Sequence, residues 1–255
     1  MNDFETLQAK AIRSHFSLDQ QCPKATLRLV TGVEPFDARI DLHVLLYYTK
    51  LCLSNPGHFL GIIHNYRSTN SKEIPVGFYF TVRRTLIKYG LEHPWGNITA
   101  CPIKFKDYLK SRIWRYHWNV DVSDALDSNS LFASVFLLNH KPPTHPYKSH
   151  TFLNSLNSKT FLRNDLGTVL RFWLTPARFR MCTCGSETYD LAQHLLFSCA
   201  QTRKELFTYT SKLDTPLLPQ FRPNTLLKFL RVVAHSHIML EDFNQMIAKL
   251  TYPRY

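Results

Sequence analysis

The residues of this chain best suited to hold a metal ion lie between positions 182 and 199. Cys182, Cys184, His194 and Cys199 follow one another there as C-x-C, nine residues, and H-x4-C. Zinc prefers four tetrahedral ligands drawn from thiolate and imidazole, usually as two pairs that are each local in sequence. Three thiolates and one imidazole fill all four positions and leave none for water. The pattern therefore predicts one structural zinc ion, not a catalytic one.

The spacing also constrains the local backbone. Gly185, directly after the first pair, suits a tight turn, because glycine adopts left-handed conformations without steric cost. His194 and Cys199 are five residues apart. That is about 140° around an ideal α-helix, so a helix carrying both must end or bend between them. The alternative is a set of buried thiols beside a surface histidine. The polar, glycine-containing sequence around Cys182 and Cys184 argues against a packing role.

A second stretch interleaves cations with aromatic rings. Its members, opposed by the single carboxylate of Asp107, are Lys104, Phe105, Lys106, Tyr108, Lys110, Arg112, Trp114, Arg115, Tyr116 and Trp118. The cations would neutralise phosphates, and exposed rings, here Trp114 or Trp118, would stack on unpaired bases. The alternative is an amphipathic helix that turns Phe105, Leu109, Ile113 and Tyr116 inward and its cations outward. The two interpretations are compatible.

The whole chain is basic. Its 255 residues include 31 Lys and Arg against 19 Asp and Glu, a formal net charge of +12. A surplus of this size favours a polyanionic partner, RNA or DNA, through counterion release, and the alternative is a basic surface without a partner. Arg178, Arg180, Arg203 and Lys204 flank the cysteine cluster. We expect them to contact a nucleic acid that meets it.

The sequence offers little for catalysis. Asp121, Asp124 and Asp127 fall at helical spacing, which would suit either a divalent metal ion or a solvated helix face. No nucleophile-elbow motif or phosphate-binding loop accompanies the scattered Ser, His and Asp residues. We therefore expect no enzyme, and a metal-dependent nuclease is the weakest of the interpretations.

Apolar periodicity and turn residues predict a mainly α fold, in which a multi-helix domain is followed by a small zinc-knuckle module and terminal helices. Helices are expected from Asp37 to about position 54, over 76–89 with Gly90 at the end, over 102–118, and in two parts over 224–250. Prolines at 142, 143 and 146 mark the predicted boundary between domains 1–148 and 149–255.

The location follows from what the sequence lacks. No run of about 18 apolar residues is present, so no membrane helix is expected. The acidic start, Met1 to Glu5, leads into no signal peptide. We expect an intracellular protein, in the nucleus or cytoplasm, with Cys22, Cys52 and Cys101 as buried thiols and not in disulfides.

Three stretches resemble the C-terminal, post-polymerase region of non-LTR (LINE-type) retrotransposon reverse transcriptases. The Cys182–Cys199 string, with its Cys-x-Cys-Gly and His-Leu-Leu-Phe-x-Cys parts, is similar to that family's terminal zinc knuckle. The stretch 27–42 resembles the segment after the polymerase thumb, and 106–118 the basic-aromatic helix before the knuckle. Together they cover most of residues 25–205. The family's first cysteine pair is often Cys-x2-Cys, whereas one residue intervenes here.

The resemblance implies binding of element RNA or target DNA, with the rest of a reverse transcriptase as a further partner. It does not imply polymerisation. The aromatic-Ala-Asp-Asp turn of the polymerase palm is missing, and no two aspartates are adjacent. Two metal ions need such carboxylates. We therefore expect a non-catalytic nucleic-acid-binding region with a structural zinc ion. A helical protein-interaction scaffold with the same zinc site is the alternative.

Overall fold

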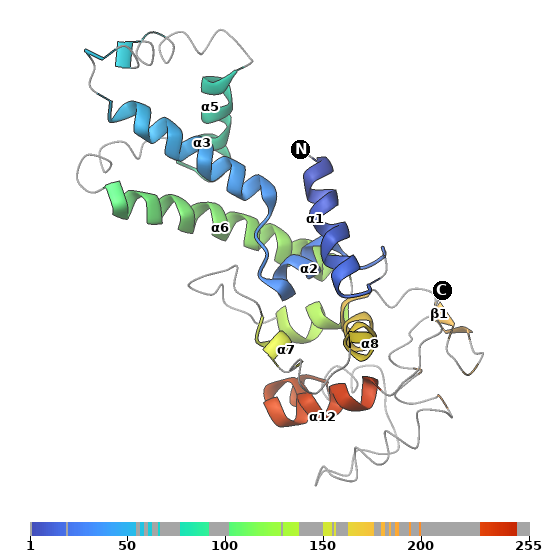
Figure 1. Ribbon diagram of the computed structural model, residues 1–255. Coiled ribbons are helices and arrows are strands. Elements are labelled where there is room, and N and C mark those ends of the chain that lie inside the picture. Colours follow the sequence, from blue (N-terminus) through green and yellow to red (C-terminus); the bar gives the residue numbers. More distant parts are fainter. Residues whose placement is uncertain are drawn as a thin grey trace. The chain divides into compact units, whose positions relative to one another are not determined.

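The computed structural model shows a mainly α-helical protein, and its described residues include a short two-stranded ribbon (Figure 1). It describes residues 2–18, 20–54, 57–58, 61–62, 66, 77–91, 102–128, 130–137, 150–154, 156, 163–175, 180–181, 184, 187–188, 194, 199 and 230–248. Its helices are α1 (Asn2–His15), α2 (Lys24–Thr31), α3 (Phe36–Cys52), α5 (Phe78–Tyr89), α6 (Pro102–Asp127), α7 (Thr151–Asn154), α8 (Arg163–Leu174) and α12 (His237–Ala248), with a π-helical turn over Ala133–Leu137. Positions 230–235 are also helical.

The expected helices are largely present. Those predicted from Asp37 and over 76–89 correspond to α3 and α5. Of the two parts predicted over 224–250, positions 230–235 and α12 are helical, and 224–229, 249 and 250 lie outside the described residues. The helix predicted over 102–118 continues as α6 to Asp127. Among the described residues, none of the helices has the length and apolar character needed to cross a membrane.

Residue contacts group the chain into two compact units. Unit 1 comprises Met1–Glu5, Glu34–Asn119 and Pro142–Pro146, and unit 2 comprises Thr6–Val33, Val120–Lys141 and Tyr147–Tyr255. The predicted division into 1–148 and 149–255 stays a prediction.

The core of unit 1 lies between α3, α5 and α6. Each helix contributes buried apolar side chains at helical spacing: Ala38, Leu42 and Leu45 from α3, Val82 and Tyr89 from α5, and Phe105, Leu109 and Ile113 from α6. The inward stripe expected on α6 is thus confirmed for three of its four members. The fourth, Tyr116, is 39% exposed, so the prediction that it turns inward was wrong.

A glycine ends α5. Gly90 has a left-handed conformation with φ of 63°. Its N–H donates to Ile87 O, and the N–H of Leu91 donates to Leu86 O. This pair of bonds is the Schellman motif, which satisfies carbonyls that a helix end leaves without partners. Glycine at position 90 therefore predicts this helix end correctly.

Unit 2 is built around aromatic side chains. Its packed rings, with neighbouring centroids 5.2–5.9 Å apart, belong to Phe132, Phe136, Phe152, Phe172, Trp173 and Phe243. Trp173 is fully buried, and its indole N–H donates to Asn244 Oδ1 at 2.8 Å. This bond gives the buried indole the hydrogen-bond partner it needs and joins α8 to α12.

A buried ion pair fixes α2 against the last part of α6 in unit 2. Arg28 Nε donates to the two carboxylate oxygens of Asp121 at 3.1 and 3.0 Å, and Arg28 Nη2 also bonds Asp121 Oδ1. The Asp121 side chain is 1% exposed. A charge buried this deeply is tolerated only with an opposite charge and well-formed hydrogen bonds.

Candidate metal centre and basic helix face

The group of side chains that could hold a metal ion begins at a small hairpin in unit 2. Strands β1 (Arg180–Met181) and β2 (Glu187–Thr188) pair antiparallel, with Arg180 opposite Thr188 and Met181 opposite Glu187. The chain must therefore reverse direction between Met181 and Glu187. Cys184 lies in this connection, at a turn. The hairpin thus carries Cys184, one member of the predicted ligand set.

The second part lies around His194 and Cys199. The N–H of Cys199 donates to His194 O at 2.7 Å, a bond that spans five residues. Bonds of this span are π-helical and widen the helical turn. Widening rotates two positions five apart closer to the same side of the helix. The sequence predicted a departure from ideal α-helix geometry between His194 and Cys199, and this bond is such a departure.

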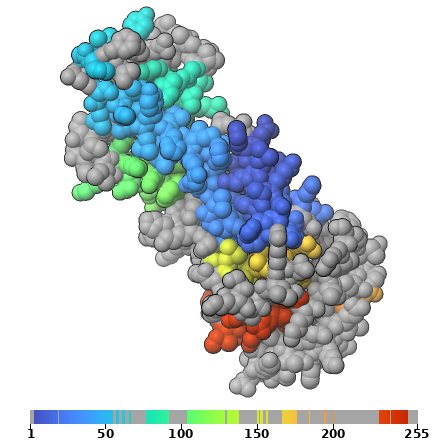
Figure 2. All heavy atoms as spheres, in the orientation of Figure 1, coloured from blue at the N-terminus to red at the C-terminus, as the bar shows by residue number. Residues whose placement is uncertain are grey.

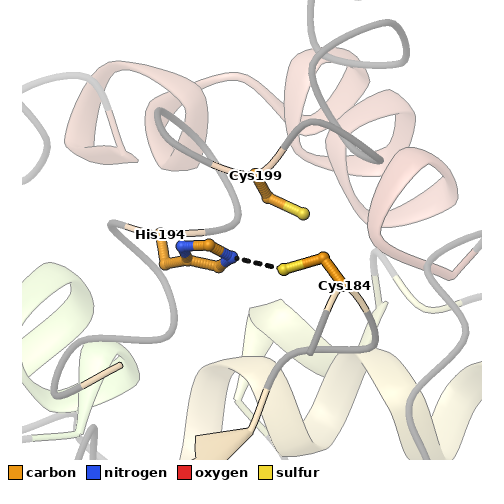
Figure 3. A group of neighbouring side chains, drawn as sticks. All are labelled: Cys184, His194 and Cys199. Carbon is orange, nitrogen blue, oxygen red and sulfur yellow. Dashed lines mark hydrogen bonds between the residues drawn. The ribbon is translucent and has the colours of Figure 1, made fainter. Parts of the chain in front are cut away.

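The side chains of Cys184, His194 and Cys199 point toward one another (Figure 3). Their ligand atoms all lie within 4.8 Å of one another, and Cys184 Sγ is 3.2 Å from His194 Nε2. Ligand atoms around a tetrahedral zinc ion are roughly 3.3–3.8 Å apart, given Zn–S near 2.3 Å and Zn–N near 2.0 Å. Cys199 is 2% exposed, while the other two are partly exposed.

The cluster has the donor types that a metal ion requires. Two thiolates and one imidazole can bind a metal ion, and zinc takes ligands of this kind. The fourth predicted ligand, Cys182, lies outside the described residues. So do three of the predicted flanking cations, Arg178, Arg203 and Lys204; the fourth, Arg180, lies in β1. In the part of the chain that the structure describes, no second group of three such donors comes together.

The predicted cations of α6 fall into two groups. Lys104, Lys106 and Arg115 are exposed. Lys110 is half-buried, with Nζ 5.7 Å from the ring centroid of Trp114. Arg112 is exposed as a residue, yet its Nη2 donates to Tyr89 O at 3.2 Å. The first group is open to a ligand, whereas Lys110 and Arg112 also have contacts within the protein.

The rings of α6 are arranged differently from the sequence prediction. Trp118 is 5% exposed, so the prediction that it stacks on bases was wrong. Trp114 is half-buried, and its indole nitrogen is buried. The exposed rings are Tyr108 at 47% and Tyr116 at 39%. Atoms of α6, in green, reach the surface in the view of Figure 2.

Sequence reasoning missed two cations of α5. Arg83 and Arg84 are both exposed. The signal was present, because Val82 and Thr85 alternate with them at positions that a helix turns inward. With these two added, α5 and the part of α6 in unit 1 carry a single carboxylate, Asp107. Their cations are Arg83, Arg84, Lys88, Lys104, Lys106, Lys110, Arg112 and Arg115.

A polar network links the three helices of unit 1. Tyr89 Oη lies 2.6 Å from Asp41 Oδ2 and 2.6 Å from His117 Nε2, and Lys88 Nζ donates to Asp41 Oδ2 at 2.8 Å. Burial and the hydrogen bond to Asp41 raise the pKa of Tyr89 above its ordinary value. The phenol therefore stays protonated and donates to Asp41.

The aspartates 121, 124 and 127 form no metal cluster. Asp121 is buried and bonded to Arg28, whereas Asp124 and Asp127 are exposed. The helical spacing predicted a shared face, but the paired carboxylate of Asp121 belongs to the packing of α2 on α6.

Comparison with protein-family models, with curated proteins and with solved structures found no match to this chain.

Proposed function

We propose that this chain is a non-catalytic, nucleic-acid-binding region of a reverse-transcriptase-like protein of the non-LTR retrotransposon type, with a structural zinc knuckle. The observation that carries the proposal is the charge on α5 and α6. α5 and the part of α6 in unit 1 together carry eight cations and one carboxylate. Five of these cations are exposed: Arg83, Arg84, Lys104, Lys106 and Arg115. So dense a positive charge destabilises itself unless anions or counterions offset it, and phosphates do so while releasing the counterions.

The proposed role of the metal is to order the hairpin. Zinc held by Cys184, His194 and Cys199, with Cys182 as the fourth ligand, joins the β1–β2 connection to the turn that ends at Cys199. Apparent binding energies of small zinc modules are about 10–16 kcal/mol, enough to order such a segment. Arg178, Arg180, Arg203 and Lys204 flank this segment in the sequence, and we expect them to contact phosphate.

The test compares two variants with the same change in net charge. Lys104→Glu/Arg115→Glu reverses exposed cations of α6, and Lys10→Glu/Lys50→Glu reverses exposed cations of α1 and α3. Fluorescence anisotropy with labelled RNA and DNA oligonucleotides measures the affinity. We expect the wild-type affinity to fall steeply between about 50 and 200 mM salt, with a log–log slope near −0.7 to −0.9 for each phosphate contacted.

The α6 variant should bind roughly tenfold or more weakly, with a shallower salt slope, and the matched variant should lose much less. Equal losses in the two variants would mean that net charge, and not this helix, attracts the nucleic acid. Undetectable or salt-independent binding by the folded wild-type protein contradicts the proposal.

A second candidate is a helical protein-interaction scaffold with the same zinc site. Phe80 and Ile87 on α5 favour it, because they are 37% and 55% exposed and stand one turn to either side of Arg83 and Arg84. If the chain is such a scaffold, Lys104→Glu/Arg115→Glu should leave its function unchanged. Phe80→Ser/Ile87→Ser should then lose a partner protein that co-purifies with the wild type. The two pairs of substitutions therefore separate the candidates.

A further inference from the structure

We infer that the nucleic acid bound by α6 is single-stranded and that its unpaired bases stack on Tyr108 and Tyr116. This inference rests on the proposed function and deepens it, because charge alone attracts duplexes and single strands alike. The shared ligand chemistry is an unpaired base on a phosphate backbone, as in single-stranded RNA and single-stranded DNA.

The first support is the order of side chains along α6. Lys104, Tyr108, Arg112 and Tyr116 follow one another at steps of four residues, and all four are exposed. Each step rises about 6 Å and turns about 40° around the helix axis, so the two rings are about 12 Å apart along it. Cations and rings thus alternate along one winding stripe. A single strand needs this alternation, because each of its nucleotides presents a phosphate and a base.

The second support is that each exposed ring lies beside a buried ring of unit 1. Tyr116 packs edge to face with the buried Tyr89, with centroids 5.1 Å apart, and Lys88 Nζ lies 5.7 Å from its ring centroid. Tyr108 lies 6.3 Å from the buried Phe105. A ring that is already held in place loses little conformational entropy when a base stacks on it. Both rings keep a substantial exposed fraction.

The third support is the position of Arg112 between the two rings. One of its nitrogens bonds Tyr89 O, which holds the guanidinium at the end of α5. A guanidinium has five N–H donors, so further donors remain for phosphate. Arg112, which lies between the two tyrosines in the sequence of α6, thus keeps donors for a phosphate.

Duplex nucleic acid does not suit these rings. Its bases are stacked inside the helix, and their faces cannot be reached from outside without unstacking. The cations of α6 would still contact duplex phosphates. Loss of the rings should consequently weaken binding to single strands and leave binding to duplexes unchanged.

The experiment measures the affinity of the full chain for three probes of one sequence: single-stranded RNA, single-stranded DNA and the DNA duplex. The test variants are Tyr108→Leu and Tyr116→Leu. The conservative variants Tyr108→Phe and Tyr116→Phe keep the ring. Tyr47→Leu, which removes a 53% exposed tyrosine of α3, is the matched control. Circular dichroism and thermal unfolding show which variants are folded, and Tyr108→Leu is expected to fold because Tyr108 is the more exposed of the two rings.

Each leucine variant should bind single strands about 5- to 150-fold more weakly, the range for loss of one base–aromatic stack. Duplex affinity, the phenylalanine variants and Tyr47→Leu should stay near the wild type. Similar losses on single strand and duplex, or no loss in a folded Tyr108→Leu protein, overturn the inference while the salt-dependent binding of the proposed function stands. Absence of salt-dependent binding to every probe is the separate failure of that function. If RNA is weakened more than DNA, stacking is upheld and RNA is identified as the ligand.

Discussion

Arg112 Nη2 donates a hydrogen bond to the backbone oxygen of Tyr89 at a distance of 3.2 Å. The guanidinium thereby lies at the C-terminal end of α5, where unpaired carbonyls carry partial negative charge. Three residues further along α6, Arg115 is exposed and has no such bond among the described residues. Two arginines of one helix, both predicted to contact nucleic acid, therefore differ in what they do for the fold.

This difference predicts that two matched substitutions change the free energy of unfolding by different amounts. Arg112→Gln should lower the free energy of unfolding by about 1 kcal/mol or somewhat more, because it removes a charge-assisted bond at a helix end. Arg115→Gln should leave stability within about 0.5 kcal/mol, as is usual for exposed positions. Urea unfolding followed by circular dichroism measures both. Equal stability of the two variants would show that the bond to Tyr89 contributes nothing.

Removal of any one of the three donors Cys184, His194 and Cys199 should lower both the zinc content and the thermal stability of the protein. Cys184→Ser, His194→Ala and Cys199→Ser should each lose most of the bound zinc and lower the melting temperature, since each removes a ligand of the one site. Chelation of zinc from the wild type should produce the same lower melting temperature. Metal analysis and thermal unfolding measure the two effects.

The control for the metal prediction is Cys52→Ser. The expectation that Cys52 is buried was wrong, because this cysteine of α3 is exposed. The Cys52→Ser variant should keep one zinc ion per chain. A wild-type protein purified with no zinc, and unable to take it up from solution, would contradict the cluster as a metal site.

The buried pair of Arg28 and Asp121 predicts a strong asymmetry between single and double substitutions. Asp121→Asn should cost about 3–5 kcal/mol, because it leaves the Arg28 charge without its carboxylate in a buried setting. Arg28→Met/Asp121→Leu should cost much less, since it removes both charges. Urea unfolding of the two variants provides the measurement. A small loss in Asp121→Asn would mean that the pair is hydrated in solution.

Local patterns in the sequence were sufficient to predict helix ends that depend on the residues at those ends. Asp37 and Gly90 mark the start of α3 and the end of α5, because a carboxylate suits a helix start and glycine a left-handed cap. The apolar spacing of Phe105, Leu109 and Ile113 likewise predicted the buried face of α6. The donor types and spacing of the cysteine cluster predicted three side chains that the structure brings together.

Contacts between residues distant in sequence could not be predicted in this way. The sequence predicted a helix over 102–118, whereas α6 continues to Asp127. The helix goes on because Asp121 is buried against Arg28, which lies 93 residues earlier in the sequence. Ring exposure on α6 has the same origin. Trp114 or Trp118 was expected to stack on bases, but packing buries Trp118 and leaves Tyr108 and Tyr116 at the surface.

The hydroxyl of Tyr89 predicts a loss of stability at alkaline pH. Burial and the hydrogen bond to Asp41 raise its pKa above the ordinary value. The folded protein therefore holds this proton more tightly than the unfolded chain does. The stability that results is complete below about pH 10, the pKa of an unfolded tyrosine, and is lost as the pH rises toward the folded pKa.

Tyr89→Phe tests this directly. At neutral pH the variant should be less stable by about 1–3 kcal/mol, because Asp41 and His117 each lose a bond to the hydroxyl. Above about pH 10 the difference between wild type and variant should shrink, since ionisation of Tyr89 destabilises the folded wild type alone. Tyr48 also has a raised pKa, chiefly from burial, so its ionisation affects both proteins and cancels in the comparison. Urea unfolding at a series of pH values measures the difference, and a gap that stays constant from neutral to strongly alkaline pH would contradict the network.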